Sequence, residues 1–318
     1  MPLGNLMEKK VSIVIPTKNG GLLFQKVLLG IKEQKFSGSI EVVVIDSGSD
    51  DGTFNFAKNH GATVVSVPPD TFNHGKTRNR GIEISSGDIV VLMTQDAVPA
   101  NEYLIHNLVS AFEDHDVAGS YARQLPRKDA DIFTKRTLNN WLTGREESEV
   151  RQIVNFAEYR SMKPIDQYLF CNFDNVCSAI RRSVWEQIPL FANDFGEDID
   201  WSKRALEAGW KIAYQSKASV IHSHDRSILY EYKRTYMCHR KLYELFKIQT
   251  IPSKKYVFLS ILNSIKKDWL FAIRCNETLL KKFFLLGKCV PLCVASSLGQ
   301  YCGAKDEKSS FYKKYSGV

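Results

Sequence analysis

The sequence lacks the signatures of several common protein classes. Its seven Cys residues form no Cys-x-x-Cys pair, which argues against the usual zinc sites and against a disulfide framework. Neither Gly-x-Gly-x-x-Gly nor Gly-x-x-x-x-Gly-Lys-[Ser/Thr] occurs, so the dinucleotide fingerprint and the P-loop are excluded as phosphate-binding devices. Met1 to Lys10 contains no signal-peptide core. We therefore expect a cytoplasmic protein whose thiols stay reduced.

Length and composition indicate an ordinary globular protein. The 318 residues are 44% hydrophobic and 25% charged, enough to bury a full core and one appended region. The net charge of +8 is confined to the end of the chain, because residues 253–318 carry twelve Lys and Arg against four Asp and Glu. Residues 1–252 are therefore neutral overall.

The first fifty residues predict a βαβ unit. Residues 11–16 form an apolar run that ends in the turn-forming residues 17–21, residues 22–34 have helical spacing of apolar side chains, and residues 41–45 form a second apolar run. A strand, a helix and a strand within this length predict a parallel sheet that binds ligands at the carboxyl ends of its strands.

Two further predicted strands also end in polar residues. Residues 63–67 lead into a segment containing Arg78 and Asn79, and residues 88–93 lead into Gln95 and Asp96. Surface turns and solvated arginines would explain most of these side chains taken singly. Asp96 is the exception, because a carboxylate directly after a buried strand is costly unless it is paired or binds a metal.

Three carboxylates lie close together at residues 195–201, in the segment Phe-Gly-Glu-Asp-Ile-Asp-Trp. They precede a pattern of helical spacing, and acidic side chains at a helix N-terminus stabilise free amides and the helix dipole. Capping explains one acid more easily than three, so catalysis is the competing interpretation.

The order of these motifs resembles that of the inverting family 2 glycosyltransferases. The matching segments cover about residues 10 to 228 and are Pro16-Thr17-x-Asn19, Val44-Ile45-Asp46-Ser47-Gly48-Ser49, Gln95-Asp96-Ala97 and Glu197-Asp198. The resemblance implies an α/β protein with the GT-A fold, a Rossmann-like, mostly parallel sheet flanked by helices. Phe72-Asn73-His74-Gly75-x-Thr77-Arg78-Asn79 and Thr94-Gln95-Asp96-Ala97-x-Pro99 are similar to segments of bacterial rhamnosyltransferases that build surface polysaccharides from dTDP-L-rhamnose.

The resemblance also implies residue roles. Asp198 is the expected catalytic base, Glu197 assists it, and Asp200 is a cap or an ion-pair partner. The expected divalent cation, Mg²⁺ or Mn²⁺, is bound by Asp96 and His222, with His224 as a second imidazole. This chain departs from the family's Asp-x-Asp motif, because Thr94 or Gln95 stands at the position of its first acid and Ala97 at its last position. The residues expected to bind the donor nucleotide are Pro16, Thr17, Asn19, Asp46, Ser47, Gly48, Arg78, Asn79 and Gln95.

The implied reaction is inverting transfer of L-rhamnose from dTDP-L-rhamnose to a saccharide or lipid-linked saccharide, as in O-antigen or capsule synthesis. One alternative is a transferase of the same family that uses a UDP-hexose or a UDP-N-acetylhexosamine. An alternative of another class is a catalytically inert module that binds through its basic tail. No nucleic-acid-binding motif supports a nucleic-acid partner.

We expect two regions, a GT-A catalytic domain at residues 8–228 and a basic amphipathic helical region at residues 229–318. Within the first, residues 8–120 form the donor half and residues 121–228 the acceptor half, where Asp174 and Asn175 are candidates for acceptor contact. Helical patterns at 229–247, 256–274 and 278–286 place Lys pairs beside large apolar residues. These helices either contact the anionic inner face of the cytoplasmic membrane or pack on the catalytic domain.

Overall fold

A computed structural model describes residues 10–192, 195–224 and 226–306. The predicted start of the catalytic domain at residue 8 and the final residues 307–318 of the predicted tail lie outside this part. The strands are β1 (Lys10–Thr17), β2 (Ser39–Asp46), β3 (Thr63–Ser66), β4 (Ile89–Met93), β5 (Val98–Pro99), β6 (Val117–Leu125), β7 (Glu149–Arg151), β8 (Cys177–Arg181) and β9 (Lys211–Ile221). The α-helices are α1 (Gly21–Lys32), α2 (Thr53–Asn59), α3 (His74–Ile84), α4 (Leu104–Val109), α5 (Ile132–Asn139), α6 (Phe156–Ser161), α7 (Pro164–Phe170), α8 (Arg182–Gln187), α9 (Glu197–Glu207), α10 (Ile228–Phe246), α11 (Lys254–Arg274) and α12 (Leu279–Lys305).

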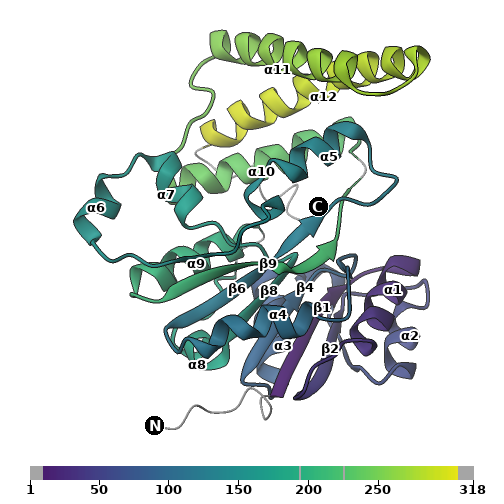
Figure 1. Cartoon of the computed structure of the whole chain (residues 1–318), viewed down its shortest axis with the longest axis vertical. Helices are drawn as coiled ribbons and strands as arrows, with labels where there is room; N and C mark the ends of the chain where they lie inside the picture. The colour runs from purple at the N-terminus through teal and green to yellow at the C-terminus, as the bar shows by residue number, and fades with distance from the viewer. Residues whose placement is uncertain (1–9, 193–194, 225, 307–318) are drawn as a thin grey trace. The chain divides into compact units, whose positions relative to one another are not determined.

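The described strands form one mixed sheet in the order β3-β2-β1-β4-β8-β6-β9-β5, with β7 paired to β9. The first four strands of this order are parallel, β8 is antiparallel to both of its neighbours, and β6 and β9 are again parallel. Figure 1 shows these strands side by side with helices on both faces. The prediction of an α/β fold with a mostly parallel sheet is therefore confirmed.

The apolar runs form the strands because both faces of the sheet are covered. Ile13 and Ile15 face a core that includes Phe24 of α1 and Leu108 of α4. On the other face α3 lies so close to β1 that a Cβ on Gly81 would be 2.2 Å from Cγ1 of Val14. This close approach brings the polar N-terminal end of α3 near the carboxyl ends of the strands.

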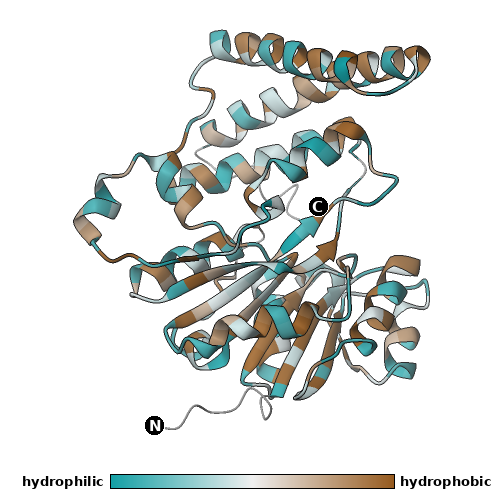
Figure 2. Cartoon of the chain, viewed as in Figure 1, coloured by the Kyte–Doolittle hydropathy of each residue, from teal (hydrophilic) through white to brown (hydrophobic). Residues whose placement is uncertain are grey.

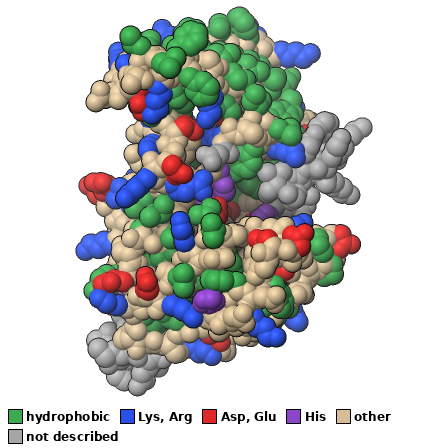
Figure 3. Space-filling model, turned by 90° about the vertical axis from the view of Figure 1, so that its right-hand side faces the viewer, with side chains coloured by type: hydrophobic (Ala, Val, Ile, Leu, Met, Phe, Trp, Pro, Cys, Tyr) green, Lys and Arg blue, Asp and Glu red, His purple; other side chains and the backbone are tan. Residues whose placement is uncertain are grey.

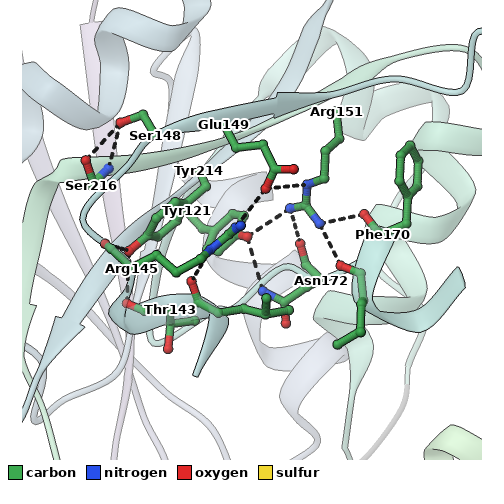
Figure 4. A network of polar contacts seen from close by, with 12 residues as sticks. Tyr121, Thr143, Arg145, Ser148, Glu149, Arg151, Phe170, Asn172, Tyr214 and Ser216 are labelled. Carbon is green, nitrogen blue, oxygen red and sulfur yellow. Dashed lines mark hydrogen bonds and ion pairs between the residues drawn. The ribbon is translucent and has the colours of Figure 1, made fainter. Parts of the chain in front are cut away.

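A buried arginine holds together part of the segment that was predicted to be the acceptor half. Arg151 of β7 donates hydrogen bonds to the carbonyl oxygens of Leu169, Phe170 and Asn172 and to the hydroxyl of Tyr121 on β6 (Figure 4). One guanidinium thus satisfies several backbone carbonyls of the segment that leads from α7 to β8. That segment includes Asp174 and Asn175.

The contacts within the chain divide it into two units. The first comprises the described residues of Met1–Asp129, Lys135–Met162 and Leu169–Ser223, and the second those of Ala130–Thr134, Lys163–Tyr168 and His224–Val318. The second unit contains α10, α11 and α12. The sequence pattern predicted a last helix only to residue 286, but α12 continues through Pro291 to Lys305. Among the described helices none is both long and apolar enough to cross a bilayer.

Candidate active site

Asp46 organises the ends of the first two strands. The strand register pairs it with Thr17. Its carboxylate accepts hydrogen bonds from the Thr17 hydroxyl at 3.1 Å, from the backbone amides of Gly48 and Ser49 at 3.1 and 2.9 Å, and from the Ser49 hydroxyl at 2.5 Å. Four donors match the acceptor capacity of a carboxylate. A nucleotide base that binds Asp46 would therefore replace one of the two hydroxyl donors.

The other residues predicted at this edge lie in the same loops. Asn19 accepts a hydrogen bond from the backbone amide of Asp50 at 2.9 Å, and the side chain of Gln95 bonds both backbone polar groups of Lys18 at 2.9 and 3.1 Å. Ser47 donates to the carbonyl of Thr17 at 3.0 Å. Pro16 is the penultimate residue of β1. Loops from β1, β2 and β4 therefore meet at one edge of the sheet, as expected for a nucleotide-binding edge.

Gly48 lets the loop after β2 lie close to Pro69. Its φ is +87°, which favours glycine, and a Cβ there would lie 2.8 Å from Cγ of Pro69. A side chain at this position would force the loop after β2 away from Pro69.

Arg78 and Asn79 belong to a different cluster. Arg78 is buried in α3 and forms an ion pair with Glu197 at 2.8 Å. Its Nε is also buried and has no hydrogen-bond partner among the described residues. Asn79 accepts a hydrogen bond from the indole of Trp185 at 2.8 Å and donates one to the carbonyl of Leu190 at 2.7 Å. The side chain of Asn79 thus holds the segment that precedes α9, and it is not brought to the edge formed by Thr17 and Asp46.

The acidic stretch begins α9 after Gly196, whose φ is +70°. The N-cap residue has no side chain to cap the helix, so the acids that follow act in the first turn. Glu197, 5% exposed, accepts hydrogen bonds from Arg78 and from the Asn175 amide, the latter at 3.0 Å. Asp198 accepts from the backbone amides of Asn175 and Ile199 at 3.3 and 2.8 Å. Asp200 pairs with Arg204 at 2.9 Å, which confirms its interpretation as an ion-pair partner.

The pKa values of Glu197 and Asp198 are shifted in opposite directions. Burial raises the pKa of Asp198, the negative charges of Glu197 and Asp174 raise it further, and together they bring it to about 8. Burial alone would also raise the pKa of Glu197, but the charges of Arg78 and His74 and the hydrogen bond from Asn175 lower it overall. Paired groups with opposite shifts are typical of acid–base sites. Glu197 is held as a carboxylate, and Asp198 is the group that exchanges a proton near neutral pH.

Asp96, His222 and His224 form a candidate metal site. Each offers one ligand atom, and these atoms lie within 4.8 Å of one another. Oδ2 of Asp96 is 3.5 Å from Nε2 of His222. One carboxylate and two imidazoles suit a divalent transition-metal ion such as Mn²⁺. The three residues predicted as metal ligands are therefore brought together although the chain separates Asp96 from the histidines.

Sequence reasoning missed Gln124 and misjudged Asn175. Gln124 is buried near the end of β6, where its side chain bonds both Asp174 and His222. Asn175 was expected to contact an acceptor, but it is buried and its amide is committed to Glu197 and to the hydroxyl of Ser178. It supports the acidic pair instead.

Comparison with known proteins identifies the family. The family described as Glycosyl transferase family 2 matches residues 12–188. The O-antigen chain rhamnosyltransferase RfbN of Salmonella typhimurium is 33% identical over 229 residues, which cover 71% of this chain and 70% of that protein. The chain belongs to glycosyl transferase family 2. A second member, the O-antigen chain rhamnosyltransferase WbaN of Salmonella anatum, is 31% identical over 70% of this chain and 69% of its own length.

Solved structures support the fold of this family 2 glycosyltransferase. Glucosyl-3-phosphoglycerate synthase from Mycobacterium tuberculosis, solved with Mn²⁺, UDP-glucose and phosphoglyceric acid, aligns with a TM-score of 0.51 at 19% identity, over 77% of this chain and 81% of that one. Residues 1–349 of TarS from Staphylococcus aureus align with a TM-score of 0.52 at 14% identity, over 96% and 91% of the two chains. These similarities confirm the GT-A fold. The family excludes the alternative of an inert binding module.

Proposed function

We propose that this glycosyltransferase moves L-rhamnose from dTDP-L-rhamnose to a hydroxyl of a saccharide or lipid-linked saccharide during bacterial polysaccharide synthesis. The names of the two Salmonella relatives support this donor and this process. The observation that carries the chemistry is the partly buried Asp198 carboxyl with its raised pKa at the start of α9. Asn175 donates hydrogen bonds to both Asp198 and Glu197, and Glu197 forms the ion pair with Arg78.

The proposed step is a single displacement. The acceptor oxygen forms a bond to the anomeric carbon of the donor sugar while the bond from that carbon to the diphosphate oxygen breaks. Asp198, as a carboxylate, takes the proton of the acceptor hydroxyl, and the nucleoside diphosphate leaves with the bonding electron pair. Attack opposite the leaving group inverts the anomeric configuration.

A divalent cation, Mg²⁺ or Mn²⁺, bound by Asp96, His222 and His224 would neutralise charge that develops on the diphosphate. The carboxylate oxygen of Asp96 suits either ion, and the two imidazole nitrogens favour a transition-metal ion such as Mn²⁺ over Mg²⁺. The buried Nε of Arg78, which lacks a hydrogen-bond partner in the described part of the chain, supports a second contact to the diphosphate.

A panel of nucleotide sugars tests the donor. Purified full-length enzyme is incubated with dTDP-L-rhamnose, UDP-glucose or UDP-N-acetylglucosamine, with Mn²⁺ and a saccharide acceptor, and release of free nucleotide is measured. Release from dTDP-L-rhamnose alone supports the proposal. Turnover of a UDP-sugar in preference to it would favour the alternative of a UDP-hexose or UDP-N-acetylhexosamine transferase and would overturn the assignment of rhamnose.

We also propose that α11 and α12 bind the anionic inner face of the cytoplasmic membrane. Leu279, Leu280, Phe283 and Phe284 at the start of α12 are 86%, 81%, 77% and 68% exposed. The two helices together carry nine Lys and Arg and a single acid, Asp268. Figure 2 shows hydrophilic and hydrophobic residues alternating along α11, and Figure 3 shows hydrophobic side chains gathered over these helices, with Lys and Arg at the margin.

This combination favours a lipid surface over a protein partner. Exposed aromatic and aliphatic side chains gain free energy by entering the acyl boundary, while neighbouring lysines bind anionic headgroups. Each basic residue near such a surface contributes on the order of 1 kcal/mol. Peripheral binding of this kind would bring the enzyme to a lipid-linked acceptor.

Vesicle sedimentation tests the membrane proposal. Wild-type protein should bind vesicles of phosphatidylcholine with phosphatidylglycerol and bind pure phosphatidylcholine far more weakly. Phe283→Ser combined with Phe284→Ser should abolish binding. Leu22→Ser, which removes a 74% exposed side chain from α1, is the matched control and should bind normally. Equal binding by the Phe283/Phe284 variant, or dimerisation of wild type in place of vesicle binding, would contradict the proposal.

A further inference from the structure

A chain of hydrogen bonds runs behind the candidate metal site. The side-chain amide nitrogen of Gln124 donates to Oδ2 of Asp174 at 2.7 Å, and its carbonyl oxygen is 3.1 Å from Nδ1 of His222. The other oxygen of Asp174 accepts from the backbone amide of Val176 at 2.8 Å. Gln124 and His222 are both buried.

This chain determines where the hydrogen of His222 lies. An ionised carboxylate only accepts hydrogen bonds, so Asp174 requires the NH₂ group of Gln124 to face it. The carbonyl oxygen of Gln124 must then face His222. Because that oxygen is also only an acceptor, Nδ1 of His222 must carry the hydrogen, and the neutral ring has its lone pair on Nε2. Nε2 is the atom that lies 3.5 Å from the carboxylate of Asp96.

We propose that Gln124 and Asp174 are positioning residues that hold His222 in the Nδ1–H tautomer, so that Nε2 is presented with Asp96 as a ligand for a divalent cation. The inference rests on the proposed metal site, to which it adds the outer residues that orient the ligand. A metal-bound histidine commonly donates its second N–H to such a partner, and loss of that partner typically lowers metal affinity about 10- to 100-fold.

The arrangement predicts that one designed variant releases the tautomer preference of His222 and that another reverses it. In Gln124→Leu the acceptor for Nδ1–H is lost, and the tautomer preference of His222 is released. In Asp174→Asn the new amide can donate to Gln124, so the Gln124 side chain can turn and present its NH₂ group to Nδ1. That reversal places the hydrogen of His222 on Nε2, where it blocks the metal.

The test measures the tautomer and the metal directly on the full chain. Protein labelled with ¹⁵N-histidine is studied by NMR at a pH at which the ring is neutral, and the His222→Gln spectrum assigns the signal. Mn²⁺ binding is measured by electron paramagnetic resonance. We expect the Nδ1–H form in wild type, a shift toward the Nε2–H form in Asp174→Asn, and Mn²⁺ affinity reduced about 10- to 100-fold in both Asp174→Asn and Gln124→Leu.

Asn172→Leu is the matched control. Asn172 is 5% exposed, as is Gln124, and its amide bonds the hydroxyl of Tyr121 in the network of Figure 4. It should keep the wild-type tautomer and Mn²⁺ affinity. An Nε2–H tautomer in wild type, or an unchanged tautomer and Mn²⁺ affinity in both variants, would overturn the proposal. Neither readout involves a sugar donor, so an error in the proposed function would leave the result unaffected.

Discussion

Replacing Asp198 by Asn should remove activity and raise stability in the same protein. The folded chain holds this carboxyl with a pKa of about 8, against a usual value of 3.8, because the surrounding protein desolvates it and Glu197 and Asp174 add negative charge. The difference corresponds to an upper limit of about 5 to 6 kcal/mol that the folded state loses when Asp198 ionises. Asparagine has nearly the same shape and never ionises, so the variant does not bear this cost.

The gain should depend on pH in a defined way. Below about pH 4 the Asp198 carboxyl is protonated in both the folded and the unfolded state. Its ionisation then contributes nothing to the difference in stability between wild type and Asp198→Asn. As the pH rises from about 4 to about 8, the unfolded carboxyl ionises while the folded one keeps its proton, so wild type loses stability that Asp198→Asn retains. Above about pH 8 the difference is constant.

Thermal melts and transfer assays check both consequences. A gain in stability of only about 2 kcal/mol, well below the upper limit, would raise the melting temperature of Asp198→Asn by about 4 to 8 °C near pH 8. Loss of the general base should lower kcat about 10²- to 10⁴-fold while calorimetry still detects nucleotide-sugar binding. Asp200→Asn is the control, because Asp200 is paired with Arg204. It should retain transfer and melt no higher than wild type. Retained turnover in Asp198→Asn, or a stability difference that does not grow with pH, would refute the assignment.

Three further predictions concern the ionisation of Asp198, the candidate metal site and the ion pair of Arg78 with Glu197. Asp198 acts as a carboxylate, so kcat/KM should rise with pH toward about 8, and Asp174→Asn should move this rise to lower pH by removing a neighbouring negative charge; an unshifted profile would exclude the charge effect. Chelation with EDTA should abolish transfer and Mn²⁺ should restore it, whereas Asp96→Asn should need far more Mn²⁺; full activity in EDTA would contradict the metal site. Arg78→Met should destabilise the fold by about 3 to 5 kcal/mol in urea unfolding, because it leaves the buried Glu197 unpaired. Adding Glu197→Gln should recover most of that stability without restoring transfer.

The sequence predicted the sheet well because its strands are defined locally. Residues 11–16, 41–45, 63–67 and 88–93 are apolar runs bounded by turn formers, and each lies in a strand of the structure to within one residue. Once the strands are parallel, their carboxyl ends share one edge, which places Thr17 opposite Asp46. The end of α12 could not be predicted in the same way, since a proline within a helix is tolerated only where tertiary packing supports the helix on both sides.

The individual roles in the site were harder to predict. Arg78 was expected to contact the donor, and no sequence pattern indicated its ion pair with Glu197, which lies 119 residues further along the chain. Asn175 was expected to meet an acceptor and instead bonds Glu197. No local pattern reports such contacts, because Arg and Asn are compatible with loops, helix surfaces and buried pairs alike.

The sequence by itself determined the family, the first four strands along the chain and the kinds of side chain at their ends, since each follows from a motif or an apolar run within a short segment. The tertiary structure decided which of three neighbouring acids can act as the base. Glu197 is kept ionised by Arg78 and His74, Asp200 is paired with Arg204, and Asp198 is desolvated near the negative charges of Glu197 and Asp174. Burial and neighbouring charge set a pKa, and both come from residues that only folding brings together.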